Sequence, residues 1–276
     1  MIRTAGLTKR YGDLTALDGL DLHVAAGTLF GFLGPNGAGK TTTIKLITGL
    51  LRPTRGDAWI GSHSILTEPL LAKAHFGYVA DTPFLYDKLT AREFLEFVGA
   101  LYGVPPDTAR TRAERLLKLL ELEDAADALI EGYSHGMRQK TALAGALLHD
   151  PPVLILDEPI GGLDPPSSRR IKQLLRGLTA RGRTVFLSTH VLEVAERLCD
   201  RVAILDHGRL IAEGTLDELR ARAPGTASLE EAFVALTHGA GDRDIEEFLE
   251  GTEAGGPEGD EGGAPPAGPG PALPRR

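Results

Sequence analysis

A glycine-rich segment between an apolar run and a helical pattern constrains this fold more than any other feature. The segment reads Gly34-Pro35-Asn36-Gly37-Ala38-Gly39-Lys40-Thr41. It follows the apolar stretch 28–33 and opens a helix that we expect over Lys40–Leu51, ended by Pro53. Glycines allow the backbone to aim successive amides inward, and the first turn of a helix adds its positive dipole end. The segment therefore predicts a strand, an anion-binding loop and a helix.

The spacing of this segment matches the motif Gly-x-x-x-x-Gly-Lys-Ser/Thr, which binds nucleotide phosphates. Lys40 is placed to reach the β- and γ-phosphates, and the Thr41 hydroxyl is placed to ligand Mg²⁺. An incidental glycine-rich turn is the alternative, and the strand and helix on either side argue against it.

Two carboxylates end a second apolar run, Val153–Leu156. Ligands of open α/β sheets bind at the carboxyl ends of the strands. Asp157 is therefore placed to hold Mg²⁺, and Glu158 is placed to accept a hydrogen bond from an attacking water. His190 ends the run 184–190, where a neutral imidazole contacts a γ-phosphate or orients the water. Taken alone, these side chains would be interpreted as ordinary solvated or helix-capping residues at strand ends; beside the phosphate loop, the catalytic interpretation is favoured.

The order of the patterns predicts an α/β fold of the P-loop NTPase type. Short strands come first, a helical stretch spans about 88–150, and strands then alternate with helices. We expect a mostly parallel sheet with an N-terminal antiparallel portion and an inserted helical subdomain. The expected domain is 1–237, followed by a tail over 238–276.

Charge is unevenly distributed along the 276 residues, whose formal net charge is −8. Residues 239–276 carry nine acids and three arginines and hold 16 Gly or Pro, so we expect a mostly disordered acidic tail. The remainder is close to neutral without a basic stripe, and no nucleic acid is expected as a partner. A single cysteine excludes an internal disulfide. No apolar run reaches the length of a membrane span or a secretory signal.

A third motif gives the chain a family resemblance. Tyr133-Ser134-His135-Gly136-Met137-Arg138-Gln139-Lys140 resembles the signature Leu-Ser-Gly-Gly-Gln of the ATP-binding cassette (ABC) family. The segments 158–164 and 188–190 resemble the D-loop and switch-histidine motifs of that family, and 228–233 resembles the terminal helix of export-type cassettes. The resemblance covers about Ile2–Thr237.

The resemblance implies a role for each matched residue. Tyr11 stacks on adenine, and Gly34 through Thr42 cradle the phosphates of ATP and its Mg²⁺. Asp157 supports Mg²⁺, Glu158 is the catalytic base or water-positioning carboxylate, and His190 senses the γ-phosphate. Ser134 and Gly136 contact ATP held by the opposite subunit. An ATP-dependent homodimer with two-fold symmetry follows from this arrangement.

Two positions depart from the family pattern. Asp81 stands where the family has a glutamine; it retains the ability to ligand Mg²⁺ but cannot donate a hydrogen bond when ionised. His135 and Met137 replace the common Gly and Gln of the signature, whereas Ser134 and Gly136 remain. We expect a working site.

The resemblance implies the ATP-hydrolysing subunit of an ABC membrane transporter, most simply an exporter. Its expected place is peripheral, on the cytoplasmic side of the membrane, with a separate polytopic permease as partner. The loop Asp81–Thr90 and the helical subdomain would contact that permease. Phe84, Leu85 and Tyr86 are the candidate contact residues, and ordinary packing within the subdomain is the alternative for them. Two other functions stay open: a soluble ABC ATPase acting on ribosomes or DNA, and a nucleotide-dependent interaction module without turnover. The transported substrate is not encoded in this chain.

Overall fold

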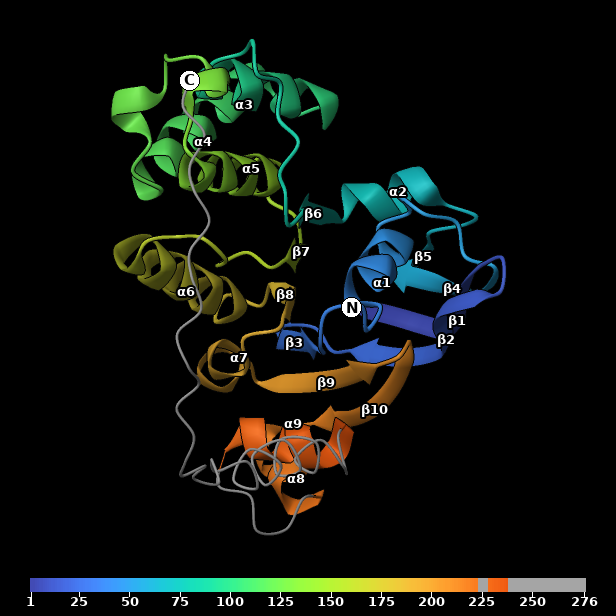
Figure 1. Ribbon diagram of the computed structural model, residues 1–276. Coiled ribbons are helices and arrows are strands. Elements are labelled where there is room, and N and C mark those ends of the chain that lie inside the picture. The colour runs from blue at the N-terminus through green and yellow to red at the C-terminus, as the bar shows by residue number, and fades with distance from the viewer. Residues whose placement is uncertain (223–227, 238–276) are drawn as a thin grey trace, which may run out of the picture. The chain divides into compact units, whose positions relative to one another are not determined.

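The computed structural model describes residues 1–222 and 228–237, and Met1–Thr237 form one compact unit (Figure 1). The predicted tail lies outside the described residues. The unit contains one mostly parallel sheet, one antiparallel sheet and a group of helices. This is the α/β architecture that the sequence predicts.

The mostly parallel sheet has six strands in the order β10-β9-β3-β8-β7-β6. Its strands are β3 (Leu29–Leu33), β6 (Phe76–Val79), β7 (Val153–Asp157), β8 (Thr184–Thr189), β9 (Arg201–Asp206) and β10 (Arg209–Gly214). All adjacent pairs are parallel except β9 and β10, which form a hairpin around His207 and Gly208. The carboxyl ends of β3, β7 and β8 therefore meet at one edge of the sheet.

The antiparallel sheet has the order β2-β1-β4-β5. It is built from β1 (Ile2–Tyr11), β2 (Leu14–Val24), β4 (Arg55–Ile60) and β5 (His63–Ser64). The sequence patterns predict strands over 2–7 and 20–24, which are shorter than β1 and β2. The exposed faces of both strands carry polar residues that interrupt the apolar pattern.

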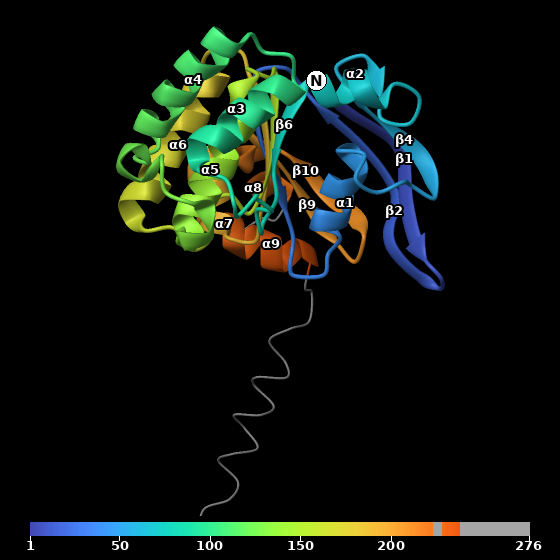
Figure 2. The same cartoon turned by 90° about the horizontal axis from the view of Figure 1, so that it is seen from above.

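The parallel sheet is covered on both faces, which explains why its strands are continuous apolar runs. In β7, Val153 and Ile155 pack with the antiparallel sheet and α1, whereas Leu154 and Leu156 pack with the helices of the opposite face. Figure 2 shows the antiparallel sheet on one side of the molecule and α4, α5 and α6 on the other. Side chains alternate across the sheet as the strand geometry requires.

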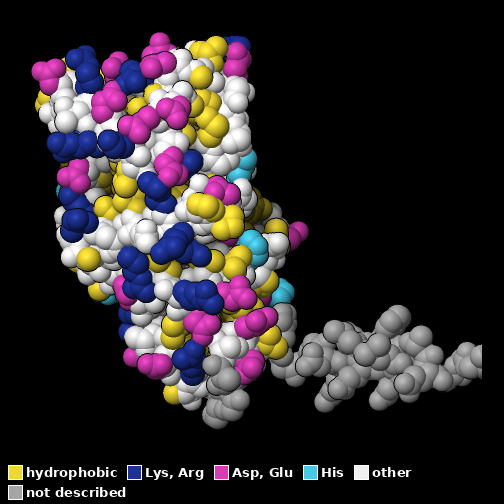
Figure 3. All heavy atoms as spheres, turned by 90° about the vertical axis from the view of Figure 1, so that its left-hand side faces the viewer, with side chains coloured by type: hydrophobic (Ala, Val, Ile, Leu, Met, Phe, Trp, Pro, Cys, Tyr) yellow, Lys and Arg dark blue, Asp and Glu magenta, His cyan; other side chains and the backbone are white. Residues whose placement is uncertain are grey.

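The inserted helical region consists of α3 (Ala91–Leu101), α4 (Pro106–Leu119), the 3₁₀ turns Glu123–Ala125 and Ile130–Gly132, and α5 (His135–Leu148). Thr90 begins α3 with a capping box, since its side chain accepts from Glu93 N while the Glu93 carboxylate accepts from Thr90 N. On the face shown in Figure 3, Lys and Arg side chains lie among Asp and Glu side chains. Within the helical region, Arg92 pairs with both Glu114 and Asp127.

Five further helices lie elsewhere in the described chain. They are α2 (Pro69–Ala74), α6 (Pro165–Thr179), α7 (Leu192–Leu198), α8 (Leu216–Arg222) and α9 (Leu229–Thr237). The sequence patterns predict helices over 167–178, 191–198 and 229–236, which agree with α6, α7 and α9 to within a few residues. They do not predict α2 and α8, which are short and carry no long apolar periodicity.

The first helix is shorter than expected. α1 spans Lys40–Ile47, so the expected end near Leu51 is wrong. Gly49 has a φ of +68°, its N–H donates to Leu46 O, and the N–H of Leu50 donates to Lys45 O. This is a Schellman motif, which ends a helix before Pro53 is reached.

Candidate nucleotide-binding site

The loop 34–39 connects β3 to α1, and two of its glycines are required by close backbone contacts. A Cβ on Gly34 would lie 2.3 Å from the carbonyl oxygen of Leu205. A Cβ on Gly39, whose φ is +107°, would lie 2.6 Å from the carbonyl oxygen of Ala16. Gly37 also has a positive φ but meets nothing within 4 Å, so its side of the loop is open. The loop is held against the protein at both ends and accessible at its tip.

Lys40 begins α1 and turns back over the loop. Its Nζ donates to Gly34 O at 2.7 Å and to Pro35 O at 3.1 Å, and the residue is only 7% exposed. Burial lowers the pKa of Lys40, and the nearby carboxylates Glu158 and Asp157 act against that shift. The ammonium is therefore held in place before any phosphate arrives.

Asp157 ends β7 at the same edge of the sheet. It pairs with Ser188 of β8, and Thr189 in turn pairs with Leu33, the residue before the loop. Asp157 is 1% exposed; its Oδ1 accepts from Ser188 Oγ, while its Oδ2 has no hydrogen-bond partner among the described residues. The missing hydrogen bond of this buried carboxylate oxygen could be donated by a water bound to a metal ion.

Glu158 and His190 are in direct contact. Nδ1 of His190 lies 2.8 Å from Oε1 of Glu158. Glu158 has a φ of +48°, and its N–H is held by the Ser188 carbonyl and hydroxyl oxygens. A non-glycine residue in this region is strained, and such strain is concentrated at functional sites. Because an ionised carboxylate only accepts, the proton of this contact is on Nδ1.

These elements enclose a cavity of about 480 Å³. The predicted residues that line it are Tyr11, Asn36, Gly37, Gly39, Lys40, Thr41, Thr42, Asp81, Asp157, Glu158 and His190. Three predicted loop residues do not line it: Ala38 is buried, and the carbonyl groups of Gly34 and Pro35 hold Lys40. Tyr11 is half-exposed at the rim, with Lys9 Nζ 5.1 Å from its ring centre.

Sequence reasoning missed four residues of this site. Leu14, Ala16 and Gly161 also line the cavity, and Ser188 holds Asp157. Ser188 could have been found from the sequence, since it is a polar residue at the end of an otherwise apolar strand. No sequence pattern points to Leu14 and Ala16, because they reach the cavity only through the pairing of β1 with β2.

Ser134 and Gly136 lie outside this cavity. Ser134 is exposed and begins α5, where its Oγ accepts from Met137 N at 3.3 Å. The neighbouring His135 packs on the loop after Glu158, since a Cβ on Gly162 would lie 3.1 Å from the His135 ring. A single chain therefore does not bring its own signature residues to its own phosphate loop.

Within the described residues, no group of three or more His, Cys, Asp or Glu side chains forms a metal site by itself. None of the described helices has the length and apolar character required to cross a bilayer.

The loop, the acidic strand end and the parallel sheet together define a P-loop nucleotide-binding protein. A family model described as "ABC transporter" matches residues 17–161. The chain belongs to the ABC transporter family, and within that family it is an ATP-binding subunit.

Two relatives illustrate the sequence match. The chain is 43% identical to the daunorubicin resistance ATP-binding protein DrrA3 of Streptomyces coeruleorubidus, over 81% of this chain and 71% of the relative. It is 42% identical to the Nod factor export ATP-binding protein I of Ralstonia nicotianae, over 79% and 68%.

Among solved structures, one ATP-binding subunit of an ABC transporter has a TM-score of 0.81 and 36% identity, covering 86% of this chain and 99% of that one. A dimeric cassette in a post-hydrolysis state, bound to ADP and Pi, has a TM-score of 0.72 and 30% identity, covering 78% and 99%. This chain is therefore an ABC ATPase that binds ATP, and subunits of its family dimerise and work with membrane permeases.

Proposed function

We propose that this chain hydrolyses ATP to drive a separate polytopic permease that exports its substrate, acting as a peripheral subunit on the cytoplasmic side of the membrane. The observation that carries the hydrolytic part is the Glu158–His190 contact beside the phosphate loop. The names of the two relatives favour export over an action on ribosomes or DNA.

In this proposal each side chain of the cavity has one task. Tyr11 stacks on adenine, and the loop 34–42 with Lys40 binds the phosphates. Thr41 and Asp157 would hold Mg²⁺, with Asp81 as a further oxygen ligand, and the bound ion neutralises charge on the phosphates. Glu158 orients the attacking water and accepts its proton, while His190 holds the Glu158 carboxylate and faces the γ-phosphate.

The dimer completes the site. Ser134 begins α5, so its hydroxyl and the free N–H groups of the first turn present donors to an anion. Because these donors lie outside the chain's own cavity, we propose that they bind the γ-phosphate of ATP held by a second copy in a two-fold homodimer. Hydrolysis removes the shared anion and weakens the pair.

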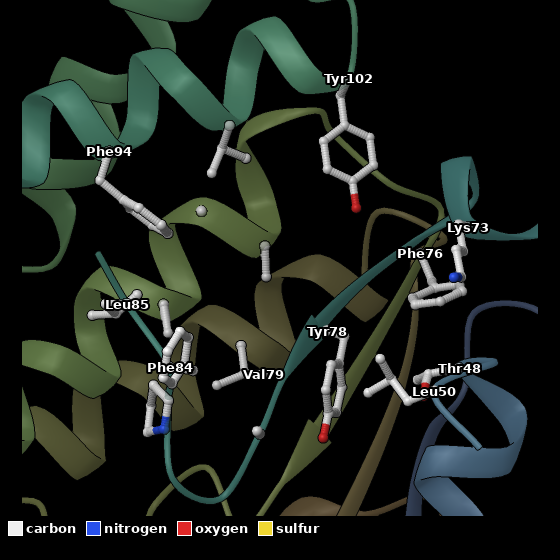
Figure 4. A pocket seen from close by; sticks show the side chains of 16 residues that line it. Thr48, Leu50, Lys73, Phe76, Tyr78, Val79, Phe84, Leu85, Phe94 and Tyr102 are labelled. Atoms are coloured by element: carbon white, nitrogen blue, oxygen red, sulfur yellow. The ribbon is translucent and has the colours of Figure 1, made fainter. Parts of the chain in front are cut away.

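An apolar groove is the proposed permease contact. It encloses about 390 Å³ between the helical region and the sheet, and Figure 4 shows the side chains that line it. Leu85 is 4% exposed and packs in the core, so core packing holds for that residue. Phe84 is 94% exposed and Tyr86 is 53% exposed, which is unusual for large apolar side chains. A segment of the permease would cover Phe84 and Tyr86.

The proposed domain is the cassette 1–237 with its helical subdomain at about 88–150.

The permease would select the transported substrate.

The test is affinity capture of the tagged chain from gently solubilised membranes, in the Glu158→Gln form with ATP and Mg²⁺. We expect a stoichiometric polytopic membrane protein by mass spectrometry. Phe84→Ser should reduce its recovery at least fivefold, whereas the control Ile211→Ser, at an exposed residue of β10, should not. Recovery of ribosomal or DNA-repair proteins in its place would contradict the proposal.

A further inference from the structure

His149 lies where the helical region joins the parallel sheet. It is the C-terminal cap of α5, and its Nε2 is 3.2 Å from the carbonyl oxygen of Phe76, the first residue of β6. A carbonyl only accepts, so Nε2 carries the proton and donates. The other ring nitrogen, Nδ1, is buried without a hydrogen-bond partner among the described residues.

The end of α3 reaches the same point. Tyr102 caps α3, and its ring stacks on the His149 ring with centres 3.7 Å apart and planes 11° from parallel. Tyr102 also lines the apolar groove, and Figure 4 shows its side chain directed from the end of α3 into that groove. Phe76 lines the same groove. One aromatic ring therefore contacts both the groove and His149.

Backbone packing leaves little freedom around this junction. A Cβ on Gly77 would lie 2.0 Å from the carbonyl oxygen of Ala146, so β6 and α5 are in direct backbone contact. A Cβ on Gly99 would lie 2.8 Å from Ala109, which fixes α3 against α4. Tight packing of this kind transmits a displacement instead of absorbing it.

α5 links this junction to the signature residues. Its 14 residues, His135–Leu148, lie between the caps Ser134 and His149 and span about 21 Å. A shift at the His149 end therefore changes the position of Ser134 and Gly136 at the other end.

We propose that the stack of Tyr102 on His149 couples occupation of the apolar groove to the position of Ser134 and Gly136, with His149 as a positioning residue. This inference rests on the proposed function of the groove. Coupling between two sites is reciprocal, so nucleotide bound at Ser134 must also alter the end of α3 beside the groove. The coupling can therefore be measured without the permease.

The experiment is hydrogen exchange of the full chain in the Glu158→Gln background, with and without ATP and Mg²⁺. We expect ATP to change the exchange rate of the segment 99–104 at least threefold. His149→Ala and Tyr102→Ala should each abolish that change, and Tyr102→Phe, which keeps the ring, should restore it. The inference is overturned if 99–104 does not respond to ATP, or if His149→Ala preserves the response.

The control is Phe97→Ala. Phe97 lies on α3, as Tyr102 does at its end, but its ring makes an edge contact with Tyr86, with ring centres 5.3 Å apart, and it does not line the groove. Its response to ATP should match that of the parent. If circular dichroism shows that His149→Ala does not fold, the comparison of Tyr102→Ala with Tyr102→Phe tests the coupling by itself.

Failure of this inference is distinct from failure of the proposed function. A captured permease together with an unchanged response in Tyr102→Ala rejects the coupling alone. An intact coupling with no captured permease rejects the exporter assignment alone.

Discussion

Lys40 and Asp157 are both almost fully buried, and neither forms an ion pair among the described residues. Desolvation of such groups costs free energy that a bound nucleotide and metal ion would recover. The residues that matter most for binding should therefore contribute least to the stability of the protein without ligand.

Lys40→Met tests this expectation. Methionine keeps much of the side-chain volume but removes the buried charge, so the free energy of unfolding should stay within about 1 kcal/mol of the parent or increase. ATP affinity should fall about 100-fold, as measured by titration with a fluorescent analogue. The exposed Lys45→Met should change neither quantity. A large loss of stability in Lys40→Met would show that the ammonium is structural.

Glu158→Gln tests the hydrolytic assignment. Loss of a water-positioning base should lower the rate of phosphate release by about 10²–10⁴ while ATP still binds. The matched control is Glu193→Gln on α7, which is exposed and outside the cavity. Normal turnover in Glu158→Gln would require another residue as base.

At the level of elements, the fold depends on close contacts between helices and strands. β6 lies against α5 through Gly77, and the loop 34–39 lies against β9 through Gly34. These contacts set the helical region and the phosphate loop at fixed positions relative to the parallel sheet. Small changes of side-chain volume there should therefore have large effects.

Gly77→Ala should destabilise the protein by about 3 kcal/mol, because the new Cβ would meet backbone and not a flexible side chain. Gly132→Ala is the control, since a Cβ there meets nothing within 4 Å. We expect its free energy of unfolding to stay within about 0.5 kcal/mol of the parent in urea denaturation. Equal effects of the two substitutions would contradict the packing argument.

The junction at His149 predicts a pH dependence. Burial lowers the pKa of His149 from its ordinary value near 6.5; the Phe76 carbonyl and Asp150 act against this shift, and Arg112 adds to it. The unfolded chain therefore binds the proton more readily, so this residue reduces stability as the pH falls below about 6.5.

His149→Gln keeps a donor for the Phe76 carbonyl but does not titrate. Its urea midpoint should fall less than that of the parent between pH 7 and pH 5. The exposed His23→Gln should follow the parent at both values. Parallel curves for all three proteins would exclude this role.

At the level of the whole molecule, one chain carries half of the proposed composite site. In the Glu158→Gln background, ATP and Mg²⁺ should double the mass measured by light scattering. Ser134→Arg should block this association and leave ATP binding by the monomer intact, because Ser134 is outside its own cavity. Ser62→Arg, at another exposed serine, should not affect the dimer. Loss of monomer binding in Ser134→Arg would contradict the two-chain arrangement.

The amino-acid sequence is sufficient to predict the α/β class, the phosphate loop, the acidic strand end and their order. These features are local: glycine conformation, a helix beginning and an apolar strand each depend on neighbouring residues. The sequence also contained the end of α1 in Gly49, although Pro53 was the more conspicuous signal.

The other features of the site depend on three-dimensional packing and could not be predicted. The Glu158–His190 contact, the orphaned Asp157 oxygen and the stack of Tyr102 on His149 join residues that lie far apart in the chain. The same is true of Leu14 and Ala16 at the cavity wall. Which of these side chains meet depends on strand register and on how closely the helices approach the sheet. Both are set by packing of the whole core and leave no periodic trace in the sequence.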